Sequence, residues 1–351
     1  MPAFVKQGTV APQEARYYHK KGKAQVACVL CPRGCEIEPG ERGECLIREN
    51  KDGTLYAIAY NRISSLQLDP IEKKPLYHFF PGTKIISIGA IGCNLKCLFC
   101  QNWHMVEGRI PLYTATSEDI IRSAVENESI GIAYTYNEPL IWFEFVLDTA
   151  KKAREAGLKN VLVTNGYINP RPLKELLPYI DAMNIDLKSI REEFYRKMCD
   201  GHLAPVQKTI QAAKKTCHVE LTNLIVTNKN DSREDLEGLI SWAASLGRNT
   251  VLHFSRYFPQ YKLKEPQTPE DTLLIAYRMA RKQLDYVYLG NIWSEEGSHT
   301  YCPQCRTLLI RRYGYDTDIV GLTGSRCAKC NYETGIMITE GHSPRVIEGM
   351  A

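Results

Sequence analysis

The sequence has no long hydrophobic run. None of its apolar stretches approaches the roughly 18–20 residues that a membrane-spanning helix needs. Residues 1–23 are polar and lack the apolar core of a secretory signal peptide. We therefore expect a cytoplasmic protein that has no membrane partner.

Neither sign of charge dominates. The 351 residues include 44 Lys and Arg against 40 Asp and Glu, a formal net charge of +4. A charge this small and this evenly spread does not indicate nucleic-acid binding, which normally appears as a clustered basic patch. The length is sufficient for one large domain with small appendages.

Isolated cysteines are also rare. Of the 13 cysteines, all but Cys199 and Cys217 fall into three tight groups. In a cytoplasmic protein, grouped cysteines indicate metal ligation rather than disulfides. Cys199 and Cys217 are expected to be buried thiols that pack like small apolar side chains.

The middle group is the most informative. Cys93, Cys97 and Cys100 are spaced Cys-x3-Cys-x2-Cys, with Phe99 before the last cysteine. A [4Fe–4S] cluster normally takes four thiolates, so three leave one iron open to bind a small molecule and pass it an electron. Zinc is the alternative; it needs a fourth ligand, which His104 could supply. We interpret the group as an iron–sulfur site.

The outer groups each contain four cysteines. Four thiolates in a short segment with few apolar residues could hold zinc or a second iron–sulfur cluster, and spacing alone does not decide; free thiols are a further alternative. This first group is Cys28, Cys31, Cys35 and Cys45. Two Cys-x2-Cys pairs near the end of the chain have zinc-ribbon spacing and predict structural zinc, with rubredoxin-like iron or an empty site as alternatives. These are Cys302, Cys305, Cys327 and Cys330.

Between the outer groups, residues 84–290 alternate apolar, β-rich runs with helical patterns. This rhythm predicts an α/β fold with a parallel sheet, either open and doubly wound or a partial (β/α)6 TIM-type barrel. We favour the barrel, with residues 1–80 as a cysteine-rich segment and connector, 81–292 as the barrel and 293–351 as a zinc-ribbon-like module. Within the connector, residues 69–78 could form a lid or a simple tie to the barrel.

Polar side chains follow the ends of successive predicted strands. In a barrel these ends meet at the rim that carries the active site. Such residues are also common in turns, which is the alternative. The candidates are Asn137, Glu138, Thr164, Asn165, Asp186, Lys188, His253 and Arg256. For His253 and Arg256 we expect contact with a substrate or a cofactor carboxylate; a core histidine and a surface ion pair are the alternatives.

The motif Cys93-x3-Cys97-x-Phe99-Cys100 resembles the signature of the radical SAM superfamily. The resemblance implies a [4Fe–4S] cluster whose fourth iron binds S-adenosylmethionine. Reductive cleavage of that cofactor yields methionine and a 5′-deoxyadenosyl radical, which abstracts hydrogen from a substrate. It also implies a one-electron donor such as ferredoxin or flavodoxin.

The order of the strand-end motifs resembles the glycyl-radical-enzyme activases, such as the pyruvate formate-lyase activating enzyme. By this resemblance Glu138 holds the methionine amino group. Asp186 and Lys188 lie near the methionine carboxylate and ribose, and Phe99 lies near the adenine. Thr164 and Asn165 border the cofactor, as does Asn137 within its own motif. The substrate could then be a glycyl residue of a partner protein, or else a small molecule or nucleotide.

A resemblance that covers nearly the whole chain is to the radical SAM protein of the AmmeMemoRadiSam group. It rests on segments such as CVLCPRGCEIEPGERGEC, GCNLKCLFCQNW and YCPQCRTLLIRRYGY. That group is named for the genes that occur beside it in genomes and not for a reaction. The resemblance therefore implies the fold and the cofactor and leaves the substrate open. A metal-binding docking protein without catalysis is the remaining alternative.

Overall fold

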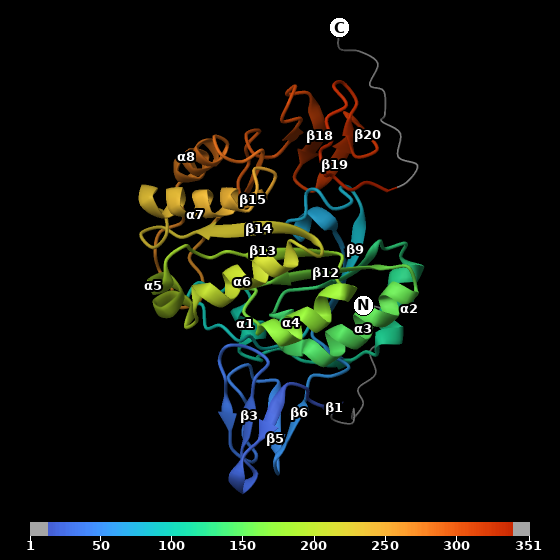
Figure 1. Ribbon diagram of the computed structural model, residues 1–351, viewed down its shortest axis with the longest axis vertical. Helices are drawn as coiled ribbons and strands as arrows, with labels where there is room; N and C mark the ends of the chain where they lie inside the picture. The colour runs from blue at the N-terminus through green and yellow to red at the C-terminus, as the bar shows by residue number, and fades with distance from the viewer. Residues whose placement is uncertain (1–12, 340–351) are drawn as a thin grey trace.

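The computed structural model describes residues 13–339. Its centre is an eight-stranded mixed sheet in which neighbours follow the order β16-β15-β14-β13-β12-β11-β9-β8 (Figure 1). The strands are β8 (Ser65–Pro70), β9 (Lys84–Gly89), β11 (Gly131–Tyr134), β12 (Lys159–Thr164), β13 (Ala182–Asp186), β14 (His218–Ile225), β15 (Val251–Arg256) and β16 (Tyr286–Gly290).

The strand order distinguishes a barrel-like sheet from a doubly wound one. Strands β9 and β11 to β16 are parallel, and each lies beside the one that precedes it in this set. A doubly wound sheet reverses its order part-way, whereas right-handed crossovers in one direction put their helices on one face, as in a barrel. Within the described residues β8 and β16 do not pair with each other, so the sheet stays open.

The predicted alternation of strands and helices is confirmed. Helix α7, for example, lies between strands β14 and β15, and Ser232 caps it by accepting a hydrogen bond from the Asp235 N–H. The helices are α1 (Trp103–Val106), α2 (Ser117–Glu126), α3 (Phe143–Glu155), α4 (Pro170–Leu176), α5 (Glu192–Phe194), α6 (Leu203–Ala213), α7 (Arg233–Ser245) and α8 (Glu270–Ala280). Two irregular turns matter below: the 3₁₀ turn η3 (Pro139–Trp142) and the π turn η5 (Tyr195–Cys199).

Strand β8 lies in the segment that we expected to be only a connector. It runs antiparallel to β9 at the edge of the main sheet. Its polar residues and Pro70 obscure a strand pattern in the sequence, and an edge position tolerates both, because one side of an edge strand needs no ladder hydrogen bonds.

The two small modules lie at opposite ends of the molecule (Figure 1). The N-terminal strands reach the carboxyl ends of the parallel strands, where Asn169, after β12, donates to the Val29 carbonyl. The C-terminal strands pack at the amino ends, where Tyr286, the first residue of β16, donates to the Thr334 carbonyl. The N-terminal strands are β1 (Gln13–Glu14), β2 (Tyr18–Lys20), β3 (Val26–Cys28), β4 (Glu36–Ile37), β5 (Arg48–Lys51) and β6 (Thr54–Ala57). The C-terminal strands are β17 (Thr300–Tyr301), β18 (Leu308–Tyr313), β19 (Asp316–Ile319), β20 (Leu322–Thr323) and β21 (Arg326–Cys327).

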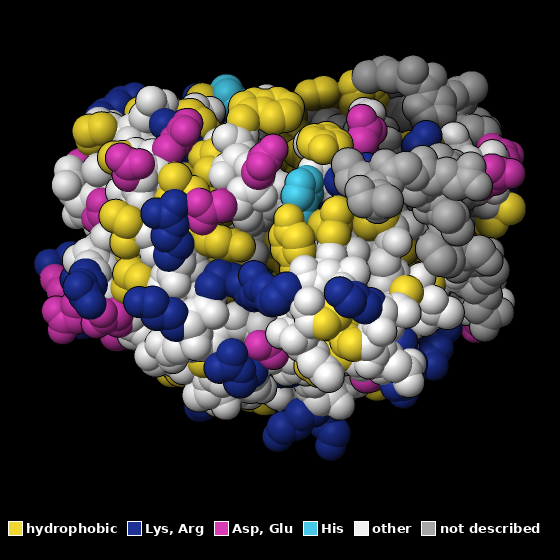
Figure 2. All heavy atoms as spheres, turned by 90° about the horizontal axis from the view of Figure 1, so that it is seen from above, with side chains coloured by type: hydrophobic (Ala, Val, Ile, Leu, Met, Phe, Trp, Pro, Cys, Tyr) yellow, Lys and Arg dark blue, Asp and Glu magenta, His cyan; other side chains and the backbone are white. Residues whose placement is uncertain are grey.

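Both signs of charge are exposed at the C-terminal end of the molecule. On the face shown in Figure 2, which looks down on the C-terminal end, Lys and Arg share the surface with Asp and Glu. Among residues 13–339, no helix has the length and the apolar character needed to cross a membrane.

Candidate functional site

The cysteine loop follows the carboxyl end of β9. Cys93, Cys97 and Cys100 are half-buried there, at the end of the strands where barrel active sites lie. Turn η5 holds the loop through its backbone: Lys96 N–H donates to the Cys199 carbonyl at 2.8 Å, and Leu98 N–H donates to the Met198 carbonyl at 2.9 Å. These hydrogen bonds therefore hold the cysteine loop in a fixed position at the rim.

Two further strand ends converge on this loop through Glu138. One carboxylate oxygen accepts hydrogen bonds from the Thr164 hydroxyl at 2.6 Å and the Leu140 N–H at 2.9 Å, and the other accepts from the Asn165 N–H at 2.8 Å. The side-chain amide nitrogen of Asn165, Nδ2, lies 3.5 Å from the Cys93 sulfur. Glu138, Thr164, Asn165 and Cys93 thus form one connected polar group.

Burial sets the electrostatics of Glu138. Its side chain is 3% exposed, and this burial raises its pKa to about 7, although the three protein hydrogen bonds favour the charged form. A carboxylate offers about four acceptor positions, of which three are used here, so about one remains for a cationic group.

Asn137 forms hydrogen bonds to the backbone that leads into the cysteine loop. Its carbonyl oxygen accepts the Ala90 N–H at 2.9 Å, and its amide nitrogen donates to the Ile91 carbonyl at 3.0 Å. Both of its polar ends therefore hold the start of the cysteine loop.

On the other side of the loop, Lys188 and Asp186 extend from the end of β13. Their side chains pair at 2.8 Å. Burial alone would lower the pKa of Lys188, but the Asp186 carboxylate, with the sulfurs of Cys97 and Cys199, raises it well above its ordinary value. A fixed cation thus stands beside Cys97.

Cys199 was not expected at this site. It is fully buried, as predicted, whereas the same prediction is wrong for Cys217, which is only half-buried. Cys199 lies against the cysteine loop, and its thiol lowers the pKa of Cys97 below the ordinary value. Phe99, the aromatic residue of the motif, is 4% exposed and packs against Phe194 with ring centroids 5.8 Å apart. Most of the Phe99 ring is therefore covered by protein.

Comparison with known proteins agrees with this arrangement. The family profile of the Radical SAM superfamily matches residues 88–243, which include the loop and the strand ends around it. An uncharacterized protein of Methanocaldococcus jannaschii is 46% identical over 335 residues, 93% of this chain and all of that protein. This chain belongs to the radical SAM superfamily.

More distant relatives include two activating enzymes. The pyruvate formate-lyase 1-activating enzyme of Escherichia coli K12 is 22% identical over 218 residues, 58% of this chain and 85% of that enzyme. The pyruvate formate-lyase-activating enzyme of Clostridium pasteurianum is 23% identical over 158 residues, 42% of this chain and 64% of that enzyme.

The residues at the loop fit the group that radical SAM proteins carry. Sulfur is the ligand atom that iron–sulfur clusters take, and the loop offers three sulfurs at one rim position. The amide of Asn165 and the ammonium of Lys188 lie beside these sulfurs and could offset the negative charge of thiolates. Cys93, Cys97 and Cys100 are thus the candidates to hold a cluster in this radical SAM chain.

The structure does not bring His253 to this loop. His253 is the third residue of β15, towards the amino ends of the strands, and its Nε2 lies 2.6 Å from a Glu220 carboxylate oxygen. Arg256 lies at the carboxyl end of the same strand, but it pairs with Glu270 at 2.7 Å and donates to the Thr268 carbonyl. Both residues therefore have protein partners.

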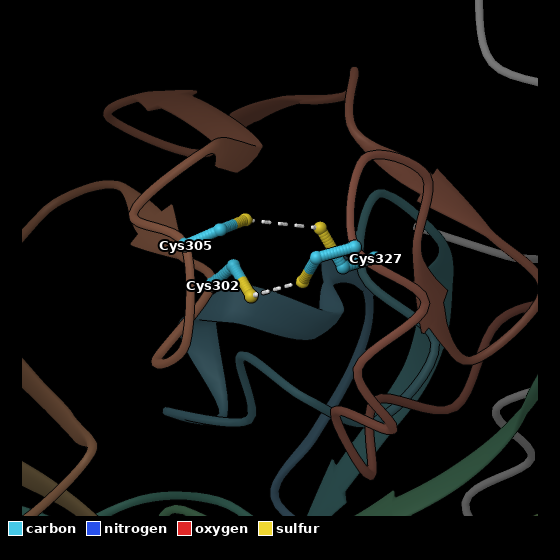
Figure 3. A group of neighbouring side chains, drawn as sticks. Cys302, Cys305 and Cys327 are labelled. Carbon is cyan, nitrogen blue, oxygen red and sulfur yellow. Dashed lines mark hydrogen bonds between the residues drawn. The ribbon is translucent and has the colours of Figure 1, made fainter.

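The four C-terminal cysteines come together as their spacing predicts. Their sulfurs all lie within 4.8 Å of one another. Two pairs of sulfurs, Cys302 with Cys330 and Cys305 with Cys327, are each 3.6 Å apart. Figure 3 shows Cys302, Cys305 and Cys327 within this group. Sulfurs around one zinc ion lie about 3.8 Å apart when each Zn–S bond is about 2.3 Å, so the set could hold a single metal ion.

Proposed function

We propose that this radical SAM protein holds a [4Fe–4S] cluster on Cys93, Cys97 and Cys100 and acts on S-adenosylmethionine. When bound, the cluster would supply the electron that splits the cofactor into methionine and a 5′-deoxyadenosyl radical, which takes hydrogen from the substrate. The observation that carries the proposal is the hydrogen-bonded connection from Cys93 through Asn165 to the buried carboxylate of Glu138.

The strand-end residues would bind and orient the cofactor. Glu138 has about one free acceptor position for the methionine amino group. Asp186 and Lys188 form an ion pair beside Cys97 that suits a carboxylate and a ribose. Thr164 and Asn137 would act by positioning Glu138 and the loop, and Phe99 would lie near the adenine.

For the substrate, we propose a glycyl residue of a partner protein. The support is the similarity to two enzymes named as activators of pyruvate formate-lyase. Such a reaction also needs a one-electron donor such as ferredoxin or flavodoxin. A glycyl radical signal in electron paramagnetic resonance (EPR), formed on added pyruvate formate-lyase, would support this substrate class. Cofactor cleavage that only a metabolite or nucleotide accelerates would contradict it.

We also propose that the chain is organised as three parts, with the partial barrel at residues 81–292. In the C-terminal part, residues 293–351, Cys302, Cys305, Cys327 and Cys330 would bind structural zinc. The distance of this module from the cysteine loop, at the opposite end of the sheet, supports a role in stability rather than in chemistry.

The test is anaerobic reconstitution with iron and sulfide, followed by dithionite and S-adenosylmethionine. We expect 5′-deoxyadenosine and methionine from the wild type. Cys97→Ala should lower the yield of both at least 100-fold, because the cluster loses one of its three thiolates. Absence of both products while the wild-type cluster is intact would refute the proposal.

Cys305→Ala is the matched control. It also removes one cysteine from a metal-type group, but at the far end of the molecule. It should lower the zinc content by about one ion per chain and reduce the free energy of unfolding, while cofactor cleavage per folded chain continues. Equal loss of cleavage in both variants would contradict the separation of the two sites.

A further inference from the structure

The first cysteine group, which we call the second cage, is a separate set of four thiols that lies outside the radical SAM motif. Cys28 ends β3, Cys31 and Cys35 follow it, and Cys45 precedes β5. All four line one pocket. Cys28, Cys31 and Cys45 are less than 10% exposed, and Cys35 is half-buried.

The spacing of these sulfurs differs from that of the C-terminal set. Four thiolates on one zinc ion lie about 3.8 Å apart, and the C-terminal sulfurs meet that requirement, with all four within 4.8 Å. Among residues 13–339, no three sulfurs of the first group lie that close together. A [4Fe–4S] cluster instead binds each thiolate to a separate iron, so its sulfurs stand farther apart around a central volume.

The surroundings also suit a cluster. The cavity lining includes apolar side chains such as Leu30, Ile37 and Ile141. The buried Arg48 guanidinium lies 3.5 Å from the Cys28 sulfur, and its Nε has no hydrogen-bond partner within the described part of the chain. Hydrogen bonds to cluster sulfurs and shielding from water are the means by which proteins stabilise and tune iron–sulfur centres.

We propose that Cys28, Cys31, Cys35 and Cys45 hold a second [4Fe–4S] cluster, with all four irons ligated by the protein, rather than a zinc ion. The proposal does not depend on the reaction proposed above, because it rests on the cage alone.

The second cage touches the cysteine loop directly. A Cβ atom on Gly92 would lie 2.1 Å from the Cys45 carbonyl oxygen, so these backbones are in close contact. Arg33, which lies between Cys31 and Cys35, donates to the Asn94 carbonyl at 2.6 Å and pairs with Asp200 at 2.8 Å. Cys45 of the first cysteine group and Cys93 of the cysteine loop, which follows Gly92, therefore lie at this contact.

The experiment measures metal content in a variant that lacks the radical SAM cysteines. Cys93→Ala/Cys97→Ala/Cys100→Ala is reconstituted anaerobically with iron and sulfide, freed of unbound metal and analysed for iron, sulfide and zinc. We expect about four irons and four sulfides per chain, together with an EPR signal after reduction by dithionite. Two zinc ions and no iron per chain, or a single iron without sulfide, would overturn the proposal.

Two further variants assign the iron to the cage. Adding Cys31→Ala to the triple variant should abolish the EPR signal of a four-thiolate cluster and at least halve the iron. Adding Cys217→Ala, which lies outside all three groups, should leave both unchanged. If the Cys31→Ala variant does not fold, the metal content of the triple variant still decides the question. Unchanged iron in a folded Cys31→Ala variant would also overturn the assignment.

Discussion

At the residue scale, the site depends on contacts that no spacing reveals. Cys199 lies 102 positions from Cys97 in the sequence, yet its thiol lies beside the Cys97 sulfur and lowers the pKa of Cys97. The sequence predicts its burial, because a free cysteine outside any metal-type group usually packs as a small apolar residue. It does not predict the partner, because that depends on how turn η5 packs against the loop.

We expect Cys199→Ala to retain the cluster but to shift its reduction potential to a more negative value. The variant removes the thiol that lies next to a ligand sulfur, and hydrogen-bond donors beside cluster sulfurs stabilise the reduced, more negative cluster. An EPR-monitored redox titration measures the shift, with Cys217→Ala as the control. An unchanged potential in Cys199→Ala would show that the contact has no electronic effect.

At the scale of elements, the strand–helix units could be predicted well and the edge of the sheet could not. The buried parallel strands are short apolar runs between helical patterns, which is the signal that periodicity detects. Strand β8 has no such signal, because its polar side chains and Pro70 are compatible with an edge strand as well as with a loop. The sheet order then decides between the two architectures that the alternation allowed.

The junction between the N-terminal module and the cysteine loop depends on one glycine. Gly92 has φ +83°, and its missing side chain admits the Cys45 carbonyl. We expect Gly92→Ala to lower the free energy of unfolding by about 3 kcal/mol or more, because the strain of a positive φ is added to a backbone clash.

Gly157→Ala is the matched variant for this prediction. Gly157 also has a positive φ, +76°, but a Cβ there would meet nothing within 4 Å. It should cost only about 1–2 kcal/mol, the strain of the left-handed conformation. Urea unfolding of both variants measures the difference, and equal losses would show that the contact with Cys45 adds no constraint.

At the scale of the whole molecule, a buried polar network joins the sheet to the C-terminal module. His78 lies beside Tyr288 of β16, with 2.7 Å between His78 Nε2 and the Tyr288 hydroxyl, and its backbone N–H donates to Glu220. Arg312 of the C-terminal module donates to the Tyr77 carbonyl next to it. This network also contains His253, whose Nε2 lies 2.6 Å from a Glu220 carboxylate oxygen.

Burial in this network lowers the pKa of His78 from 6.5 to about 3, even though the Glu220 carboxylate favours the cation. Between these values the unfolded chain binds a proton that the folded chain excludes, so stability is present above pH 6.5 and falls on acidification. At pH 5 the loss should be about 2 kcal/mol.

We expect His78→Gln to make the pH dependence of unfolding between pH 7 and pH 5 shallower by that amount. His19→Gln, at an exposed position, should leave the slope unchanged. Urea unfolding at several pH values measures both. A slope in His78→Gln equal to that of the wild type would show that His78 is not the group that titrates.

The sequence by itself determined the local features of this protein. The Cys-x3-Cys-x2-Cys motif, the zinc-ribbon spacing and the strand–helix units are set by residues within a few positions of one another, so periodicity and spacing report them. The tertiary structure decided what depends on residues far apart in the chain. It joined Glu138 and Asn165 to Cys93, and it brought Cys199 to Cys97. It also tied His253 to Glu220 in a buried network that reaches the C-terminal module. It also set the sulfurs of the first cysteine group farther apart than those of the C-terminal group. Such contacts follow from the packing of whole elements, and the spacing of residues within one segment carries no record of them.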